Sequence, residues 1–437
     1  MLKKLCSESV SPNGFALFLF ANFQKEVLKM NEQFGQSKPQ RRKSLAVSIL
    51  SLSLLTVMAG AAVAPALGII KEHFADTNQL LVQMIISMPA LFIVLTSLVF
   101  PRLSAKYRAR NLLMFGLILY TAGGAAAGII DNIYCVLIFR ALVGIGVGII
   151  MPMSTGLLAF YYTRDKQDKL MGYSSAMNQM GGAVATLLSG LLASVSWKLS
   201  FLVYLMGLIS IVLCMLFLPN EHIGGPQPAD EQLRHPNKPA TKSRSAFAEY
   251  YSFVIAMFLL MVTFFIFPCE FALETVKEGI IPQQYISVIM AGMDIIAFLG
   301  GLSFVAVKKI AGKSTRIVAP LLFAAGYAFL AFAGGWTGAL AGSVFVGFAN
   351  GLGIPFIIAT ASKKAGRAAG STVMPLLSAA LYLAQFLTPM ILSGISSLLS
   401  AVQTAHLPYC IAFVFALLFT IWSLLTIRET EKTQSSL

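Results

Sequence analysis

The chain has 437 residues, of which 57% are hydrophobic and only 11% are charged, and its formal net charge is +14. A soluble domain carries about 25% charged residues, so this composition excludes an ordinary soluble protein and indicates an integral membrane protein. So basic a chain could bind nucleic acid, but its basic residues lie in the short segments between hydrophobic runs, which is the pattern of a membrane protein.

Twelve hydrophobic runs divide the chain. Each is close to the roughly 20 residues that an α-helix needs to cross a bilayer. The runs are continuously apolar and lack the alternation of a transmembrane strand, so helices are expected rather than a β-barrel. The sequence therefore predicts an all-α membrane protein with twelve transmembrane helices. The runs cover residues 45–70, 80–100, 111–130, 133–161, 170–194, 199–218, 248–268, 285–307, 317–334, 338–361, 370–396 and 407–427.

Residues 1–44 precede the first run and are expected to form a cytoplasmic segment. The apolar stretch 14–23 is too short to span a membrane, and no small-residue cleavage site follows it, so we do not expect a signal peptide. Codons for residues 25–27 could form a bacterial ribosome-binding sequence ahead of Met30. We therefore expect translation to start at Met30, which mass spectrometry of the intact protein would test.

The basic residues separate by side of the membrane. Lys71, Lys198 and Lys277 lie in segments assigned to the outside, and every other Lys and Arg except Arg140 lies in segments assigned to the cytoplasm. Such an excess is the positive-inside pattern. It predicts a multi-pass protein of a bacterial plasma membrane with both termini in the cytoplasm.

The one long polar stretch, residues 219–247, is expected to be a cytoplasmic linker between two six-helix bundles, 45–218 and 248–427, and a cytoplasmic tail follows at 428–437. A shift of 203 residues superimposes parts of the two bundles, which indicates a duplicated unit and two pseudo-symmetric halves. The superimposed pairs are Gly144 with Gly347, Gly148 with Gly351, Pro152 with Pro355, Lys106 with Lys309, and Arg110 with Lys313. Halves of this kind are typical of transporters that bind their ligand between them at mid-membrane.

Apart from Glu249 at the edge of the run 248–268, two formal charges lie inside the predicted spans, Arg140 and Asp294. A charge there costs roughly 3 kcal/mol on insertion scales, so both are candidates for a function. Arg140 would superimpose on Ser343 and so has no counterpart in the repeat. At 1.5 Å per residue, Arg140 and Asp294 lie roughly 10 and 14 Å from the outer ends of their spans, so both could face one cavity.

Asp294 is the first candidate for a proton-coupling and substrate site. A carboxylate removed from water favours its protonated form, and it could then exchange that proton for a cationic substrate. The alternative is a structural hydrogen bond or a water-filled crevice. Arg140 stays charged and could bind an anion or bias the protonation of a nearby carboxylate. Glu270 follows the span 248–268, where a solvated residue at the mouth is the alternative to a proton-coupling residue.

Uncharged polar residues inside the spans are the candidate substrate-binding residues, although such groups also bond neighbouring helices. These candidates are Gln83, Asn178, Gln179, Asn350 and Gln385. Gly181 and Gly190 mark a helix face that can pack closely and slide against another helix.

The sequence contains no pattern for a metal, nucleotide or catalytic site. The five cysteines are scattered and form no pair with metal-ligand spacing. Gly312-Lys313-Ser314 resembles the end of a phosphate-binding loop, but Val307 stands where that motif needs a glycine. We therefore expect no cofactor and no enzymatic activity.

Three motifs resemble the major facilitator superfamily and, within it, the twelve-span drug/proton antiporters. The run 139–146, an arginine followed by glycines, resembles the fourth-span motif, with Val143 where glutamine is common. The run 197–201 is similar to the start of span six, and 382–389 to the signature of span eleven.

The resemblance implies a gate at the loop after span two and at its repeat. Lys106 and Arg110 match that loop, but Ala105 replaces its aspartate. In the span-five motif, Thr186 stands in place of proline. The candidate gate residues are Lys106, Arg110, Gly144, Gly148, Gly181, Gly190, Lys309 and Lys313. The arginine of the fourth-span motif, here Arg140, is linked in that family to proton movement.

The sequence and the resemblance together predict a secondary active transporter that exports amphipathic or cationic drugs in exchange for protons by alternating access. One alternative is a proton-coupled transporter of a specific metabolite, such as a sugar or an organic anion. A second is a membrane sensor that does not transport. We expect the partners to be a small-molecule substrate and the lipid bilayer, with no nucleic acid or nucleotide, and the chain to be a monomer.

Overall fold

A computed structural model of the chain describes residues 39–162, 164–221, 243–365, 373–399 and 406–435. In these ranges the chain forms α-helices and short 3-10 helices and no strand, which confirms the prediction of an all-α membrane protein. The expected translation start at Met30 and most of the linker lie outside the described residues.

The first group of helices, the N half, precedes the linker. Its elements are α2 (Pro39–Ala61), η2 (Ala64–Ala66), α3 (Leu67–His73), α4 (Gln79–Lys106), α5 (Ala109–Ala126), α6 (Ile133–Tyr161), α7 (Arg164–Ala193), α8 (Trp197–Ser200), η3 (Phe201–Met206) and α9 (Gly207–Phe217). The side chains of Asn78 and Asn132 accept hydrogen bonds from the first backbone N–H groups of α4 and α6, so these two helices begin at capping residues.

The second group, the C half, follows the linker. Its elements are α11 (Ser243–Glu278), α12 (Gln283–Ala311), η4 (Gly312–Ser314), α13 (Thr315–Phe332), α14 (Gly335–Ala365), α15 (Met374–Leu398) and α16 (Leu407–Ser435). Between α12 and α13 the chain reverses at Gly312, whose φ of 53° favours glycine.

Ten helical segments in the described ranges are long and apolar enough to cross a membrane. The two expected spans missing from this set correspond to α5 and α7. Arg110 and Asn111 lower the hydropathy of α5, and the charged first turns and the polar Asn178 and Gln179 lower that of α7. A total of twelve spans therefore stays a prediction.

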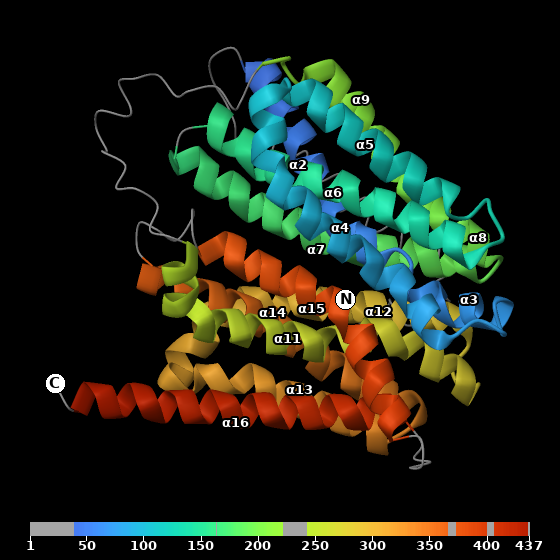
Figure 1. The fold of residues 1–437 in the computed structure, drawn as a ribbon, viewed down its shortest axis with the longest axis vertical. Coiled ribbons are helices and arrows are strands. Elements are labelled where there is room, and N and C mark those ends of the chain that lie inside the picture. The colour runs from blue at the N-terminus through green and yellow to red at the C-terminus, as the bar shows by residue number, and fades with distance from the viewer. Residues whose placement is uncertain (1–38, 163, 222–242, 366–372, 400–405, 436–437) are drawn as a thin grey trace, which may run out of the picture.

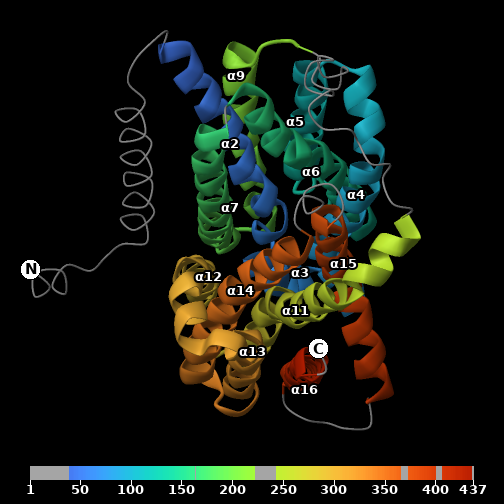
Figure 2. The same cartoon turned by 90° about the vertical axis from the view of Figure 1, so that its left-hand side faces the viewer.

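The two halves lie one against the other, the N half above and the C half below in Figure 1, and Figure 2 shows the same division from the side. We call the end where α9 stops at Phe217 and α11 starts at Ser243 the linker end. The opposite end, which carries α3, α8 and the start of α12, is the far end.

The halves meet through α7 with α12 and through α4 with α15, and at the far end α3 and η2 also contact α11. Two glycines allow close approach there. A Cβ atom added at Gly190 would lie 1.9 Å from the Cβ of Ser287, and one added at Gly68 would lie 2.7 Å from the carbonyl oxygen of Ala272. Side chains larger than hydrogen at these positions would force the halves apart at the far end.

Candidate substrate and proton site

A cavity of about 220 Å³ lies between the two halves. The N half lines it from α2, α4 and α7, and the C half lines it from α11, α12, α14 and α15. Each half thus supplies one wall. A change in the angle between the halves would change access to the cavity.

Asp294 of α12 lies in this cavity. The hydroxyl of Thr186, on α7 of the other half, donates a hydrogen bond to Asp294 Oδ2 across 3.2 Å. Among the described residues that line the cavity, Asp294 is the one with a carboxylate and Tyr382 is the one other titratable side chain. The cavity therefore contains a single acidic group.

Three predicted amide residues lie in the same cavity: Gln179, Asn350 and Gln385. Asn350 and Gln385 are buried, and the Asn350 Oδ1 atom has no hydrogen-bond partner within the part of the chain that the structure describes. These amides come from α7, α14 and α15, so both halves present hydrogen-bonding groups to a ligand.

The rest of the cavity wall is apolar. Methionine and phenylalanine side chains from α11 and α12 form part of it, and Tyr382 of α15 also lines it, with its hydroxyl donating to the sulfur of Met151 across 3.1 Å. The wall residues of this kind are Met261, Phe264, Phe265, Met290 and Met293. Flexible Met and flat aromatic side chains adapt to apolar ligands of varied shape.

Asn178, also predicted to bind substrate, bonds a neighbouring helix of its own half. Its Oδ1 accepts a hydrogen bond of 2.6 Å from the Thr56 hydroxyl of α2, and it is not among the residues that line the cavity. Of the two interpretations that the sequence left open, helix packing fits this geometry.

Arg140 is fully buried inside the N half. Its Nε donates to the Ile85 carbonyl oxygen across 2.6 Å, and its two terminal nitrogens donate to the Ala59 carbonyl oxygen and the Tyr204 hydroxyl. The Tyr204 hydroxyl in turn donates to Ala59 O across 2.8 Å. Arg140 is not among the lining residues, so Arg140 and Asp294 do not face one cavity.

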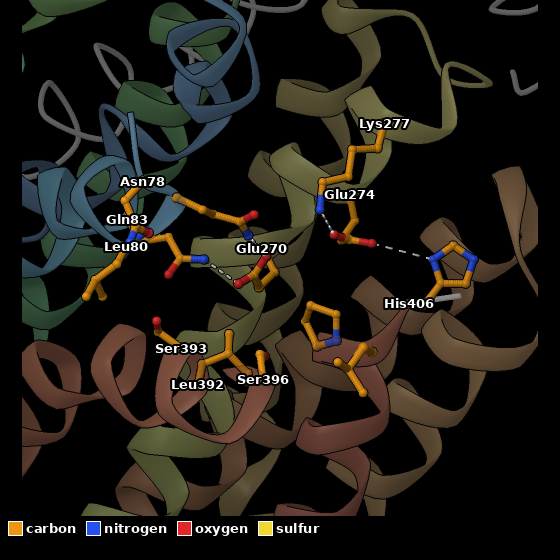
Figure 3. A pocket seen from close by; sticks show the side chains of 13 residues that line it. Asn78, Leu80, Gln83, Glu270, Glu274, Lys277, Leu392, Ser393, Ser396 and His406 are labelled. Atoms are coloured by element: carbon orange, nitrogen blue, oxygen red, sulfur yellow. Dashed lines mark hydrogen bonds and ion pairs between the residues drawn. The ribbon is translucent and has the colours of Figure 1, made fainter. Parts of the chain in front are cut away.

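A second cavity, of about 310 Å³, opens at the far end, and we call it the acidic pocket (Figure 3). Glu270 of α11 reaches across to α4 of the other half. Gln79 Nε2 donates to its Oε2 across 3.1 Å, and Gln83 Nε2 donates to its Oε1. Gln83 thus binds Glu270 in this pocket and does not line the central cavity.

The interpretation of Glu270 as a solvated residue at the mouth of a span is wrong. Only 1% of Glu270 is exposed, since α11 continues to Glu278 and Glu270 contacts Gln79 and Gln83 of α4. Glu274 is also buried, and its Oε1 accepts a hydrogen bond of 2.6 Å from Lys277. The spans therefore contain more than two charged residues.

His406, just before the start of α16, faces the carboxylates of Glu274 and Glu278. Its Nδ1 lies 3.8 Å from Glu274 Oε2 and 3.4 Å from Glu278 Oε1. In Figure 3, His406 and Glu274 lie on the side of the pocket away from α4. Within the described ranges, no cluster of His, Cys, Asp and Glu has the geometry to hold a metal ion.

The sequence interpretation missed Thr186, Gln79, Glu274 and His406. Spacing carried a signal for one of them, because Gln79 and Gln83 are four residues apart and so share a helix face. The contact of Thr186 with Asp294 joins residues 108 apart in the chain and had no local signal.

The predicted gate residues fall into two groups. The glycines are contact points: a Cβ atom at Gly144 would meet the backbone of Pro89, one at Gly148 the side chain of Thr96, and one at Gly181 the backbone of Leu54, all within the N half.

Gly190 differs from these three glycines, because it packs against Ser287 of the other half.

The second group of predicted gate residues is basic and lies at the linker end. Lys106 and Lys309 are exposed, and Arg110 donates to the Met215 carbonyl oxygen across 2.6 Å. The side chain of Lys313 lies outside the described part.

The family model of the Major Facilitator Superfamily matches residues 49–389. In Bacillus subtilis (strain 168), Multidrug resistance protein 3 is 29% identical over 104 residues, 24% of this chain and 20% of that protein. Multidrug transporter protein MdtP of the same organism is 30% identical over 113 residues, 25% of this chain and 21% of that protein. The matched stretch thus spans about a fifth of each relative's length.

Solved structures of similar fold have lower sequence identity. A bacterial homolog of the human lysosomal transporter Spinster, in an inward-facing and unoccupied conformation, superimposes with a TM-score of 0.70 at 16% identity, covering 90% of this chain and 98% of that one. The peptide transporter POT in complex with sulfate superimposes with a TM-score of 0.68 at 13% identity, covering 88% of this chain and 94% of that one.

Proposed function

This chain belongs to the Major Facilitator Superfamily, and we propose that it is a proton-coupled exporter of amphipathic organic cations that works by alternating access. One observation carries the proposal: a single carboxylate, Asp294, lies in an otherwise apolar and amide-lined cavity between the two halves. The names of the Bacillus relatives agree with drug export, over the fifth of their length that matches.

The chemistry of exchange follows from the surroundings of Asp294. Loss of water favours the protonated carboxylate, whereas a bound cation favours the ionised one. A proton and a cationic substrate therefore compete for the same group. Binding of one expels the other, which is the minimum requirement for antiport.

The direction of exchange is proposed from charge and contacts. The basic residues gather toward the linker end, so the positive-inside pattern places that end in the cytoplasm. The close contacts between the halves at Gly68 and Gly190 support a conformation that is closed at the far end of the central cavity. A substrate would then enter from the linker end and leave by the far end once the halves rock apart there.

A small polar metabolite is a second candidate substrate. The cavity, at about 220 Å³, is smaller than the roughly 300–1,000 Å³ of typical ligand sites, and three amides line it. An uncharged sugar would suit such groups. An organic anion has less support, because Arg140 is fully buried and does not line the cavity.

The test is transport by purified protein in sealed vesicles with an imposed pH gradient and an amphipathic fluorescent cation. We expect Asp294→Asn to abolish gradient-driven movement, because an amide neither takes up a proton nor attracts a cation. Asp76→Asn is the matched control, since it makes the same chemical change at an exposed far-end residue.

Three outcomes would count against the proposal. Wild-type movement that persists in Asp294→Asn would move the proton site elsewhere, first to Glu270. Absence of cation movement by the folded wild type, together with uptake of a sugar, would favour the metabolite transporter. Binding of the cation without any movement of it would favour the sensor.

A further inference from the structure

Thr186 has two possible acceptors for its single hydroxyl proton, and they lie on different halves. Asp294 Oδ2 of α12 is 3.2 Å from Thr186 Oγ1, and the carbonyl oxygen of Ala61, the last residue of α2, is 3.5 Å away. Thr186 is only 2% exposed, and these two oxygens are the acceptors that its hydroxyl reaches among the described residues.

The α7 surface facing Asp294 is shaped for a carboxylate. Gly182 lies one helical turn before Thr186, and a Cβ atom added there would lie 3.7 Å from Asp294 Oδ2 and 3.0 Å from Val57. Gly182 and the Thr186 hydroxyl thus both face the Asp294 carboxylate from one side of α7.

The choice between the two acceptors depends on the charge of Asp294. An ionised carboxylate is the stronger acceptor, because a hydrogen bond with a charged partner is roughly twice as strong as one between neutral groups. Once Asp294 takes up a proton or a cation, its oxygen loses that advantage. The Thr186 hydroxyl can then turn to Ala61, which belongs to its own half.

We propose that Thr186 is a positioning residue that ties the two halves together while Asp294 is ionised and unoccupied, and releases them when Asp294 takes up a proton or a cation. The proposal rests on the proposed function, since it assumes that Asp294 is the exchange site. It adds the link between the occupancy of Asp294 and movement of the halves.

No other ionised group competes for this role among the described residues around the cavity. The α11 wall facing Asp294 is Met261, Phe264 and Phe265, α14 presents the neutral Asn350, and α15 presents Gln385 and the phenol of Tyr382. The α2 and α7 walls are neutral as well. The pH dependence of the tie therefore belongs to Asp294 itself.

The test compares Thr186→Val, which removes the hydroxyl and keeps the shape, with Thr186→Ser, which restores it. The first readout is the pH profile of binding of an amphipathic fluorescent cation to protein in lipid nanodiscs. Loss of a hydrogen bond to the ionised form makes Asp294 keep its proton to higher pH. We expect the midpoint to rise by about one pH unit in Thr186→Val, and Thr186→Ser to lie near wild type.

The second readout is the separation of the halves, measured between spin labels at Val195 and Ile280, which are exposed at the far end of the N and C halves. We expect Thr186→Val to increase the long-distance population above the pH midpoint, where wild type keeps the tie. Thr186→Ala serves as a second variant if Thr186→Val does not fold.

The variant Asp294→Asn distinguishes failure of the proposed tie from failure of the proposed function. If it abolishes pH-dependent binding while Thr186→Val leaves both the midpoint and the distances unchanged, the tie is refuted and the proposed function stands. If Asp294→Asn keeps the wild-type pH profile, both are refuted. If Thr186→Val and Thr186→Ser shift the pH midpoint of cation binding equally, the role of the hydroxyl is refuted.

Discussion

At the scale of single residues, the two formal charges that stand out in the sequence have different surroundings. Asp294 faces a cavity shared by both halves, whereas Arg140 donates its hydrogen bonds to Ile85, Ala59 and Tyr204 within one half. An intramembrane charge is expensive, and here one charge is held by backbone carbonyls that helix packing brings together.

We therefore expect Arg140→Met to unfold more easily than wild type by about 3 kcal/mol, because it leaves buried carbonyl oxygens without donors. Tyr204→Phe, which removes one hydroxyl from the same group, should cost about 1 kcal/mol. Thermal unfolding in detergent measures both. A stable Arg140→Met that loses only gradient-driven transport would instead support the coupling role predicted for Arg140.

Asp294, Gln179, Asn350 and Gln385 could be selected from the sequence because a polar group inside an apolar run is conspicuous. They lie in one cavity. Thr186 could not be selected, since a threonine in a helix usually bonds its own backbone. Its importance depends on which residue of the other half faces it.

At the scale of helices, the sequence predicted which segments form helices better than it predicted where those helices end. The run expected at 248–268 is a helix that continues to Glu278. Hydropathy falls at Glu270 and Glu274, but α4 supplies amide donors to Glu270, and Lys277 pairs with Glu274. Burial of these carboxylates was invisible in the sequence because their partners come from elsewhere.

The α7 helix offers a prediction with an internal control. Gly190→Ala places a methyl group against Ser287 of α12, whereas Gly172→Ala on the same helix meets nothing within 4 Å. We expect Gly190→Ala to increase the open population at the far end, measured between labels at Val195 and Ile280, and Gly172→Ala to match wild type. Equal distance distributions in both variants would show that α7 and α12 adjust without separating.

At the scale of the whole molecule, polar ties that include a carboxylate of the C half join the two halves at two levels. Thr186 with Asp294 lies at the central cavity, and Gln79 and Gln83 with Glu270 lie in the acidic pocket at the far end. Division into two bundles was predicted from the linker and the repeat. The residues that bond across the two halves could not be predicted, because they are far apart in the sequence and meet only when the halves pack together.

Glu270→Gln should weaken the far-end tie, because Gln79 and Gln83 donate to the two carboxyl oxygens of Glu270 and an amide keeps only one acceptor oxygen; a hydrogen bond contributes about 0.5–1.5 kcal/mol. We expect a larger open population between the labels at Val195 and Ile280. Glu72→Gln, the same change at an exposed far-end residue, is the control. If Glu270→Gln stays as closed as the control, the glutamines do not hold the far end shut.

Both ties pair a carboxylate of the C half with uncharged donors of the N half. When such a tie breaks, no cation is left stranded in the membrane, and one proton is enough to neutralise what remains. Charge balance over a cycle then depends on how many of the two carboxylates are protonated. Exchange of one proton for one monovalent cation would be electroneutral. Exchange of two protons for one such cation would move net charge across the membrane, so the transport rate would respond to the membrane potential.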